Sequence, residues 1–266
     1  MSRVSHASLH KDRNLSMLLF QPPPPTRYDL NFDIAGIPVR VHPLFWLIAV
    51  LLGSSSNDLL QILIWVVVVF VSILVHELGH ALAMRQYGQR SYIVLHFAGG
   101  LTIPESVSWG SGWANVAQTP NRQIFISLAG PFAGFLFAAL IIAGVLILGG
   151  DVLTSRLFGL IPLPAAAFIP FGGRVLSLLV TMLLWVNVFW GLINLLPVFP
   201  LDGGQVARNI LIQYDPLDGV RKSLWISVIT GGLVAVAGLL LLRSIYMALL
   251  FGFLAFQSYQ SLQGRY

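Results

Sequence analysis

Residues 72–84 read Ser-Ile-Leu-Val-His-Glu-Leu-Gly-His-Ala-Leu-Ala-Met, and they contain the string H-E-x-x-H at 76–80. On an α-helix, residues i and i+4 lie on one face, so His76 and His80 can share a tetrahedral zinc ion. The neighbouring Glu77 can then act on a water molecule at that metal. The seventeen residues before His76 contain no charged side chain. The motif therefore predicts a metal site within a membrane-spanning helix.

The composition supports a membrane location for most of the chain. Of 266 residues, 56% are hydrophobic and only 9% are charged, whereas soluble domains carry about 25% charged residues. There is no cysteine, so a disulfide framework is excluded and a metal must be held by histidine and carboxylate. The net charge of +5 is not taken as nucleic-acid binding, because Lys and Arg positions in a membrane protein report its orientation.

The hydrophobic pattern predicts an all-α polytopic membrane protein with about six transmembrane helices and a small membrane-associated β-sheet. The expected spans are 43–53, 59–84, 124–148, 174–196, 224–242 and 245–262, of which the first is short. Between the third and fourth spans, residues 149–173 are expected to form a loop. Trp109 and Trp113 are expected at headgroup level.

Two segments are candidates for the sheet. Residues 34–41 have β-branched side chains at alternate positions, which predicts one strand, and Pro38 favours an edge position. Residues 91–103 are expected to form two short strands around Gly99-Gly100.

The chain divides into two expected regions. Residues 1–31 are basic and include the proline run 22–25, so they are expected to form a disordered cytoplasmic tail. Residues 32–266 are expected to form one membrane-embedded domain.

The positions of the basic residues predict the topology. With six spans and the N-terminus in the cytoplasm, twelve of the fifteen Lys and Arg residues fall on the cytoplasmic side and three on the other. This asymmetry obeys the positive-inside rule and predicts that both termini are cytoplasmic.

The same topology predicts which residue completes the metal site. The second span runs toward the cytoplasm, which places His76 roughly 14 Å from its helix end. The fourth span ends on the same side, at Asn194-Leu-Leu-Pro-Val-Phe-Pro-Leu-Asp202-Gly-Gly. Asp202 is therefore expected to meet both histidines as the third ligand, leaving a fourth position for water. The alternative is that Asp202 only caps the helix expected over 203–214.

Two more polar residues are candidates for catalysis. Glu77 is expected to be the general base, the alternative being a buried Glu paired with an arginine. Asn194 either donates to the substrate carbonyl or oxyanion, or caps carbonyl groups released where Pro197 and Pro200 interrupt the helix. Asn187 is expected to make a packing hydrogen bond.

The remaining histidines are not assigned to the metal. His42 is expected at the membrane interface, His96 is expected to be structural, and His6 and His10 lie in the tail.

Together, the H-E-x-x-H string and the segment 194–203 resemble the site-2 protease family of intramembrane zinc metalloproteases, peptidase family M50. Gly130-Pro131 and Gly99-Gly100 match the family's layout. The resemblance implies one zinc ion held by His76, His80 and Asp202, with Glu77 catalytic. It also implies that the substrate is a single-pass transmembrane protein cut within or near the lipid bilayer, and that the sheet lies near the active site. We assign Asn194, Gly99 and Gly100 to substrate binding or oxyanion stabilisation.

The family's accessory modules are not predicted here. Residues 85–123 are too few for the PDZ domain that some members carry, and the sequence ends too soon after the last span for CBS domains.

Two other functions fit parts of the pattern. The same bundle could retain or chaperone membrane proteins without cutting them. A metal transporter is less consistent, because its spans should carry a file of acidic residues and these spans have almost none besides Glu77. The pattern predicts neither the oligomeric state nor the identity of the membrane protein that is cut.

Overall fold

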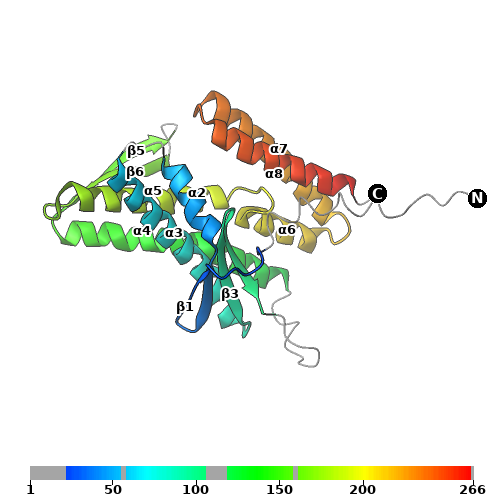
Figure 1. Cartoon of the computed structure of the whole chain (residues 1–266). Helices are drawn as coiled ribbons and strands as arrows, with labels where there is room; N and C mark the ends of the chain where they lie inside the picture. The colour runs from blue at the N-terminus through cyan, green and yellow to red at the C-terminus, as the bar shows by residue number, and fades with distance from the viewer. Residues whose placement is uncertain (1–21, 55–57, 106–118, 158–160, 265–266) are drawn as a thin grey trace, which may run out of the picture.

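The computed structural model describes residues 22–54, 58–105, 119–157 and 161–264 (Figure 1). Trp109 and Trp113 lie outside these ranges. The described elements, in chain order, are β1 Leu30–Ile34, β2 Ile37–Val41, α2 Pro43–Gly53, α3 Leu59–Gln86, β3 Ser91–His96, β4 Gly99–Pro104, α4 Pro120–Ile147, β5 Asp151–Leu157, β6 Ile161–Phe168, α5 Gly173–Asn194, α6 Asp202–Tyr214, α7 Gly219–Leu240 and α8 Ile245–Gln263.

The expected membrane architecture is confirmed. Within the described ranges, five helices are long and apolar enough to cross a bilayer: α3, α4, α5, α7 and α8. The first of the six expected spans, α2, has only 11 residues. It extends roughly 16 Å at 1.5 Å per residue, about half of the hydrocarbon thickness. The first apolar segment is thus a short helix packed on α3.

The helix with the H-E-x-x-H string is bounded by ordinary end signals. Asp58 caps α3 by accepting a hydrogen bond of 2.9 Å from Leu60 N, and Arg85 lies in the last turn. Gly79 sits between the two histidines, and a Cβ there would overlap the Ala129 carbonyl oxygen of α4. The glycine therefore permits α3 and α4 to approach closely at the level of the histidines.

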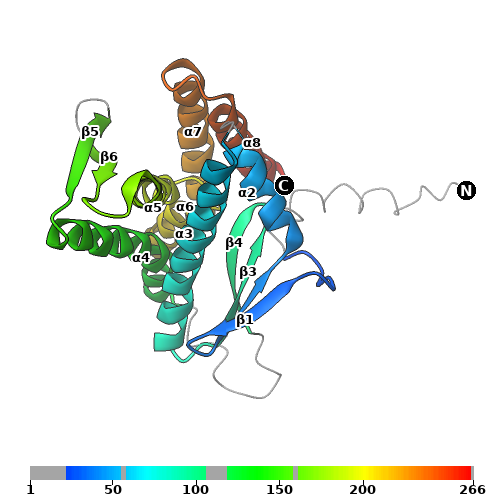
Figure 2. The ribbon, with the colours of Figure 1, turned by 60° about the vertical axis from the view of Figure 1, so that its left-hand side comes forward.

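A four-stranded sheet lies beside α3, with the order β1-β2-β3-β4 (Figure 2). The expectation of one strand over 34–41 was wrong, because the chain turns at Ala35 and Gly36, both with positive φ, and β1 pairs antiparallel with β2. The expected edge position of Pro38 was also wrong, since β2 lies between β1 and β3. Proline is tolerated there because the β2–β3 pairing begins only at Val39.

The predicted hairpin over 91–103 is confirmed, with a shifted turn. The turn consists of Phe97 and Ala98, and Gly99 and Gly100 open β4. Because β3 pairs with β2 on its other side, β4 is an edge strand of the sheet, and β1 is the opposite edge.

The loop expected over 149–173 is wrong for most of its length. β5 and β6 form an antiparallel hairpin there. Two prolines and an alanine run in β6 hide the usual alternation of strand residues. Two side chains of α5 hold the hairpin: Thr181 Oγ1 accepts from Ala167 N at 2.8 Å, and Ser177 Oγ accepts from Ile169 N at 3.3 Å.

Apolar packing joins the sheet to the helices. Val41 of β2, Phe45 of α2, Ile73 of α3 and Ile93 of β3 belong to one buried cluster. The last residues of the tail expected over 1–31 contact the folded domain. Arg40 of β2 donates to the Pro23 carbonyl at 2.9 Å, and β1 already begins at Leu30.

The α7–α8 hairpin is attached through a different cluster, in which Phe251 and Leu254 of α8 pack on Val198 of the segment 195–201. Between this hairpin and α2, α3 and α5 lies a cavity of about 1840 Å³. Its lining is mostly apolar and includes Ile48, Trp65, Trp190 and Leu250. His76, Glu77, His80 and Asp202 also line it, so the predicted site opens into this cavity.

Candidate metal centre

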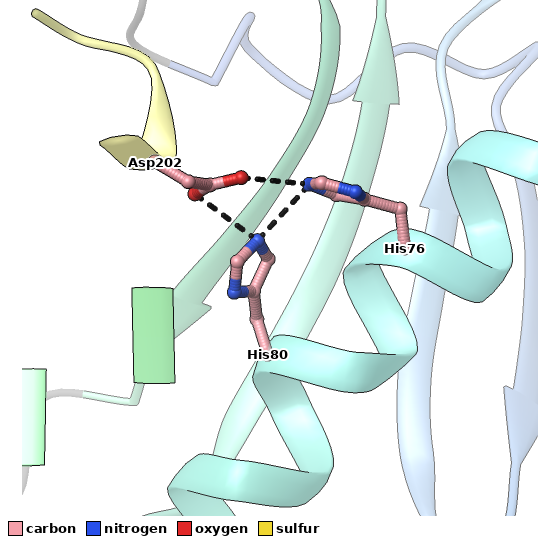
Figure 3. Close-up of side chains that lie close together, drawn as sticks. All are labelled: His76, His80 and Asp202. Atoms are coloured by element: carbon pink, nitrogen blue, oxygen red, sulfur yellow. Dashed lines mark hydrogen bonds and ion pairs between the residues drawn. The ribbon is translucent and has the colours of Figure 1, made fainter. Parts of the chain in front are cut away.

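Three side chains from two distant segments point toward one another (Figure 3). His76 and His80 project from α3, and Asp202 projects from the start of α6. The two Nε2 atoms are 3.1 Å apart. His76 Nε2 lies 3.1 Å from Asp202 Oδ2, and His80 Nε2 lies 3.3 Å from Asp202 Oδ1. The predicted convergence of these three residues is confirmed.

The orientation of His80 is set by a backbone group of α4. Its Nδ1 lies 2.7 Å from the Ile126 carbonyl oxygen. A carbonyl only accepts hydrogen bonds, so Nδ1 carries the proton and Nε2 is the nitrogen that can bind a metal ion. This is the arrangement of a metal-binding histidine with its supporting partner.

Asp202 reaches the histidines because the chain is interrupted after α5. That helix ends at Asn194, before Pro197 and Pro200, and α6 begins at Asp202. Gly203 and Gly204 allow the tight return, since a Cβ on Gly203 would overlap the Leu195 carbonyl and one on Gly204 would lie 2.5 Å from Phe199 N.

The capping alternative for Asp202 is wrong. Leu201 occupies the cap position of α6, which has no side-chain cap bond. Asp202 Oδ2 is buried without a hydrogen-bond partner. A carboxylate whose two oxygens each face an imidazole nitrogen, one of them buried without a hydrogen bond, fits a bound cation.

The spacing of the three donors fits zinc. Tetrahedral zinc with bonds of about 2.0–2.1 Å places its ligand atoms roughly 3.3 Å apart. The three distances here are 3.1, 3.1 and 3.3 Å. Two imidazoles and one carboxylate also form a ligand set typical of catalytic zinc, which keeps one position open.

Space for an ion depends on Gly130 of α4. A Cβ on this residue would overlap His80 Nε2 and would lie 2.8 Å from His76 Nε2. Gly130 and Pro131 are both buried within α4. In the sequence, Gly130 was noted only as part of Gly130-Pro131, and its position facing the two imidazoles was not predicted.

Glu77 lies against β4, an edge strand of the sheet. The residue is 6% exposed. Its Oε2 is 2.7 Å from Thr102 Oγ1, and a Cβ on Gly100 would lie 2.6 Å from its Cδ. Among the described residues, the ion pairs do not include Glu77, so the alternative of an arginine partner is not supported. Thr102 was missed, although strand alternation places it on the same face as Gly100.

The other predicted polar residues have defined positions. Asn194 is buried at the cavity and donates from Nδ2 to the Trp190 carbonyl at 3.0 Å. This bond uses one of its two amide hydrogens, so both roles considered for Asn194 stay open. Gly99 has a φ of 124° and lines the cavity. Asn187 makes the expected packing bond, donating to Ser72 Oγ at 2.9 Å.

The remaining described histidines do not join the metal-ligand group. His42 caps α2, and its Nδ1 accepts from Leu44 N at 3.2 Å. His96 is 2% exposed in β3. Burial, with smaller contributions from the neighbouring His42 and Arg40, lowers the pKa of His96 to about 4. His96 is therefore neutral at physiological pH. His6 and His10 lie outside the described residues.

Asp202→Ala is expected to weaken zinc retention strongly, because the change removes the only carboxylate of the predicted ligand set. The measurement is zinc content per purified chain after dialysis. Asp215→Ala is the matched control, because Asp215 follows the other end of α6 and pairs with Lys222 instead. Equal zinc content in both variants would contradict the role of Asp202.

Comparison with known proteins agrees with this site. The model of peptidase family M50 matches residues 64–236, which is more than half of the chain. The zinc metalloprotease MJ0392 of Methanocaldococcus jannaschii is 27% identical over 226 residues, covering 81% of this chain and 57% of that protein. The putative zinc metalloprotease sll0528 of Synechocystis is 30% identical over 195 residues, covering 68% of this chain and 43% of that protein.

The fold has a counterpart among solved structures. A site-2 protease from Methanocaldococcus jannaschii superposes with a TM-score of 0.53 and 24% identity, covering 88% of this chain and 95% of that one. The chain spans about half the length of the two curated relatives. The match to the family model shows that the chain belongs to peptidase family M50.

Proposed function

We propose that this protein is an intramembrane zinc metalloendopeptidase that hydrolyses a peptide bond within or near the transmembrane segment of another membrane protein. One observation carries the proposal. Two histidines of a membrane-length helix and a carboxylate 122 residues further along the chain converge beside Glu77, at the wall of a large apolar cavity. The names of the two relatives, a zinc metalloprotease and a putative zinc metalloprotease, support the same activity.

The residues divide the chemistry between them. His76, His80 and Asp202 would hold one zinc ion, which supplies Lewis acidity toward a carbonyl and lowers the pKa of water. Glu77 takes a proton from the attacking water and later passes one to the leaving amine, so that one N–H forms as the C–N bond breaks. Asn194 has an amide hydrogen left after its bond to Trp190 and can donate it to the developing oxyanion.

The surroundings of the site favour an extended substrate. A peptide bond inside a transmembrane helix is hidden by its own hydrogen bonds, so the substrate must unwind before it is cut. β4 is an edge strand of the sheet, and its residues 99–102 line the cavity. An unwound segment can add to this edge through main-chain hydrogen bonds, with Gly99 and Gly100 offering close approach.

Strand pairing also supports the proposed orientation. β2 precedes the α2–α3 hairpin and β3 follows it, and the two strands pair in parallel. The N-terminal strands and the β3–β4 hairpin therefore lie on the same side, as the charge asymmetry requires. We propose that this side is cytoplasmic and that both termini face the cytoplasm.

The central test is proteomic. Fragments of membrane proteins are compared between cells that contain the intact protein and cells that contain the His76→Ala/His80→Ala double variant. Proteolysis predicts fragments with ends in transmembrane segments only when the intact protein is present. Co-purification of uncut membrane proteins with a fully zinc-loaded chain, without new fragments, would instead establish the non-proteolytic binding function.

Removing the metal is expected to stop cleavage reversibly. A chelator such as 1,10-phenanthroline should abolish cleavage of a reconstituted substrate, because it removes the one zinc ion on which the proposed reaction depends. About one equivalent of zinc per chain should restore it. The measurement is fragment yield against zinc content in the same sample. Cleavage that persists in zinc-free protein would contradict a zinc mechanism.

A further inference from the structure

Thr102 makes a side-chain hydrogen bond to Glu77. Its Oγ1 lies 2.7 Å from Glu77 Oε2 and 3.0 Å from the Glu77 carbonyl oxygen. The residue belongs to β4, and Glu77 belongs to α3. A hydroxyl carries a single proton, so it can donate fully to only one of these acceptors. The carboxylate is the nearer and charged acceptor, and it forms the stronger bond.

Gly100 packs against the Glu77 side chain and leaves room for its carboxylate. Gly100 and Thr102 are two residues apart on a strand, so they face the same side of the sheet. A Cβ on Gly100 would overlap Glu77 Cγ and lie 2.5 Å from Oε1 and 2.6 Å from Cδ. The carboxylate thus rests on the bare backbone of Gly100 while Thr102 holds one of its oxygens.

We infer that Thr102 is a positioning residue for the general base: its hydroxyl holds Glu77 Oε2 and leaves Oε1 to take the proton from water. The inference rests on the proposed protease function. A free glutamate side chain has several rotamers, and only those near the attacking water are productive. Thr102 lies on β4, the edge strand that would bind the substrate. Its hydroxyl therefore fixes the Glu77 carboxylate next to the proposed substrate-binding edge.

Thr102→Val tests the role directly. Valine keeps the β-branched shape that suits a strand and replaces the hydroxyl by a methyl group. We expect kcat for a reconstituted membrane substrate to fall roughly 10- to 100-fold, the range set by one hydrogen bond to a charged group. KM should stay within about twofold, because strand addition uses main-chain groups that the change leaves intact. Thr102→Ser should restore most of kcat, and Thr154→Val in the exposed strand β5 is the matched control.

A double-mutant cycle distinguishes positioning from general structural damage. If Thr102 acts through Glu77, Thr102→Val should not lower the residual rate of Glu77→Gln any further. A fall of equal size in both backgrounds would overturn the inference, as would an unchanged kcat in Thr102→Val.

Thermal stability supplies a readout that does not need activity. Burying the Glu77 carboxylate without its hydroxyl partner should lower the Tm of Thr102→Val by several degrees, and this loss should largely vanish in Glu77→Leu. Zinc content should match the wild type throughout. Additive Tm changes would refute the Thr102–Glu77 bond.

A wild type without cleavage would refute the protease function and the catalytic role of Thr102 together, whereas cleavage lost in Glu77→Gln but kept in Thr102→Val refutes only this inference.

Discussion

Glu77→Gln is expected to reduce cleavage of a membrane substrate by roughly 10²- to 10⁴-fold, the usual contribution of a general acid–base residue. Glutamine has nearly the same size and can still accept the hydrogen bond from Thr102, but its amide cannot take up the proton of the attacking water. The three predicted ligands are unchanged, so zinc content should equal that of the wild type. The measurement pairs a cleavage assay with metal analysis on the same preparation.

The chain contains a natural control for this substitution. Glu105 is its only other glutamate, and it is exposed just after β4. Glu105→Gln makes the same chemical change and should leave the cleavage rate within about twofold. Undiminished cleavage by Glu77→Gln would exclude Glu77 as the base. Loss of zinc from that variant would show that Glu77 supports the ligands instead.

Gly130→Ala is expected to abolish or severely weaken zinc binding, although the substitution adds one methyl group and favours a helix. The new Cβ would overlap His80 Nε2, and the other ring nitrogen, Nδ1, is hydrogen-bonded to the Ile126 carbonyl. The imidazole cannot yield without breaking that bond, so we expect at least a 10- to 100-fold loss of zinc affinity, similar to the loss of a supporting partner. Cleavage should fall in parallel. Zinc affinity is measured by competition with a chelator.

Gly134→Ala is the matched control, because Gly134 lies one turn further along α4. A Cβ there would meet Asn187 at 3.5 Å, which is ordinary contact. This variant should bind zinc like the wild type, while Gly130→Ala should not. If both variants behave alike, the effect reflects packing of α4 rather than space at the ligand atoms.

Much of the site follows from local patterns in the sequence. The four-residue spacing of His76 and His80 requires only a helix, and the apolar run before them requires that this helix lie in a membrane. Pro197 and Pro200 require an end to α5, and the positions of Lys and Arg place that end on the same side as the histidines. Helix periodicity and proline act within a few residues of the chain, and the membrane imposes the same length and charge preferences on every span.

The positions of other residues depended on packing between segments. Gly130 looks like an ordinary helix-contact glycine until α4 is seen to cross α3 at the histidines. Thr102 gives no local sign of function, because its partner lies 25 residues earlier on another element. The β5–β6 hairpin was also missed, since the α5 side chains Thr181 and Ser177 help to stabilise it in place of its own residue pattern.

The amino-acid pattern alone was sufficient for the five long membrane helices and for the convergence of His76, His80 and Asp202, because periodicity, charge asymmetry and motif spacing are readable along the chain. Long-range contacts produce three other features: the position of Glu77 against β4, the space beside the two imidazoles at Gly130, and the cavity between α8 and α3. The sequence carries no distance between such segments, and a hydroxyl or a missing Cβ acquires its role only when another backbone comes within a few ångströms of it.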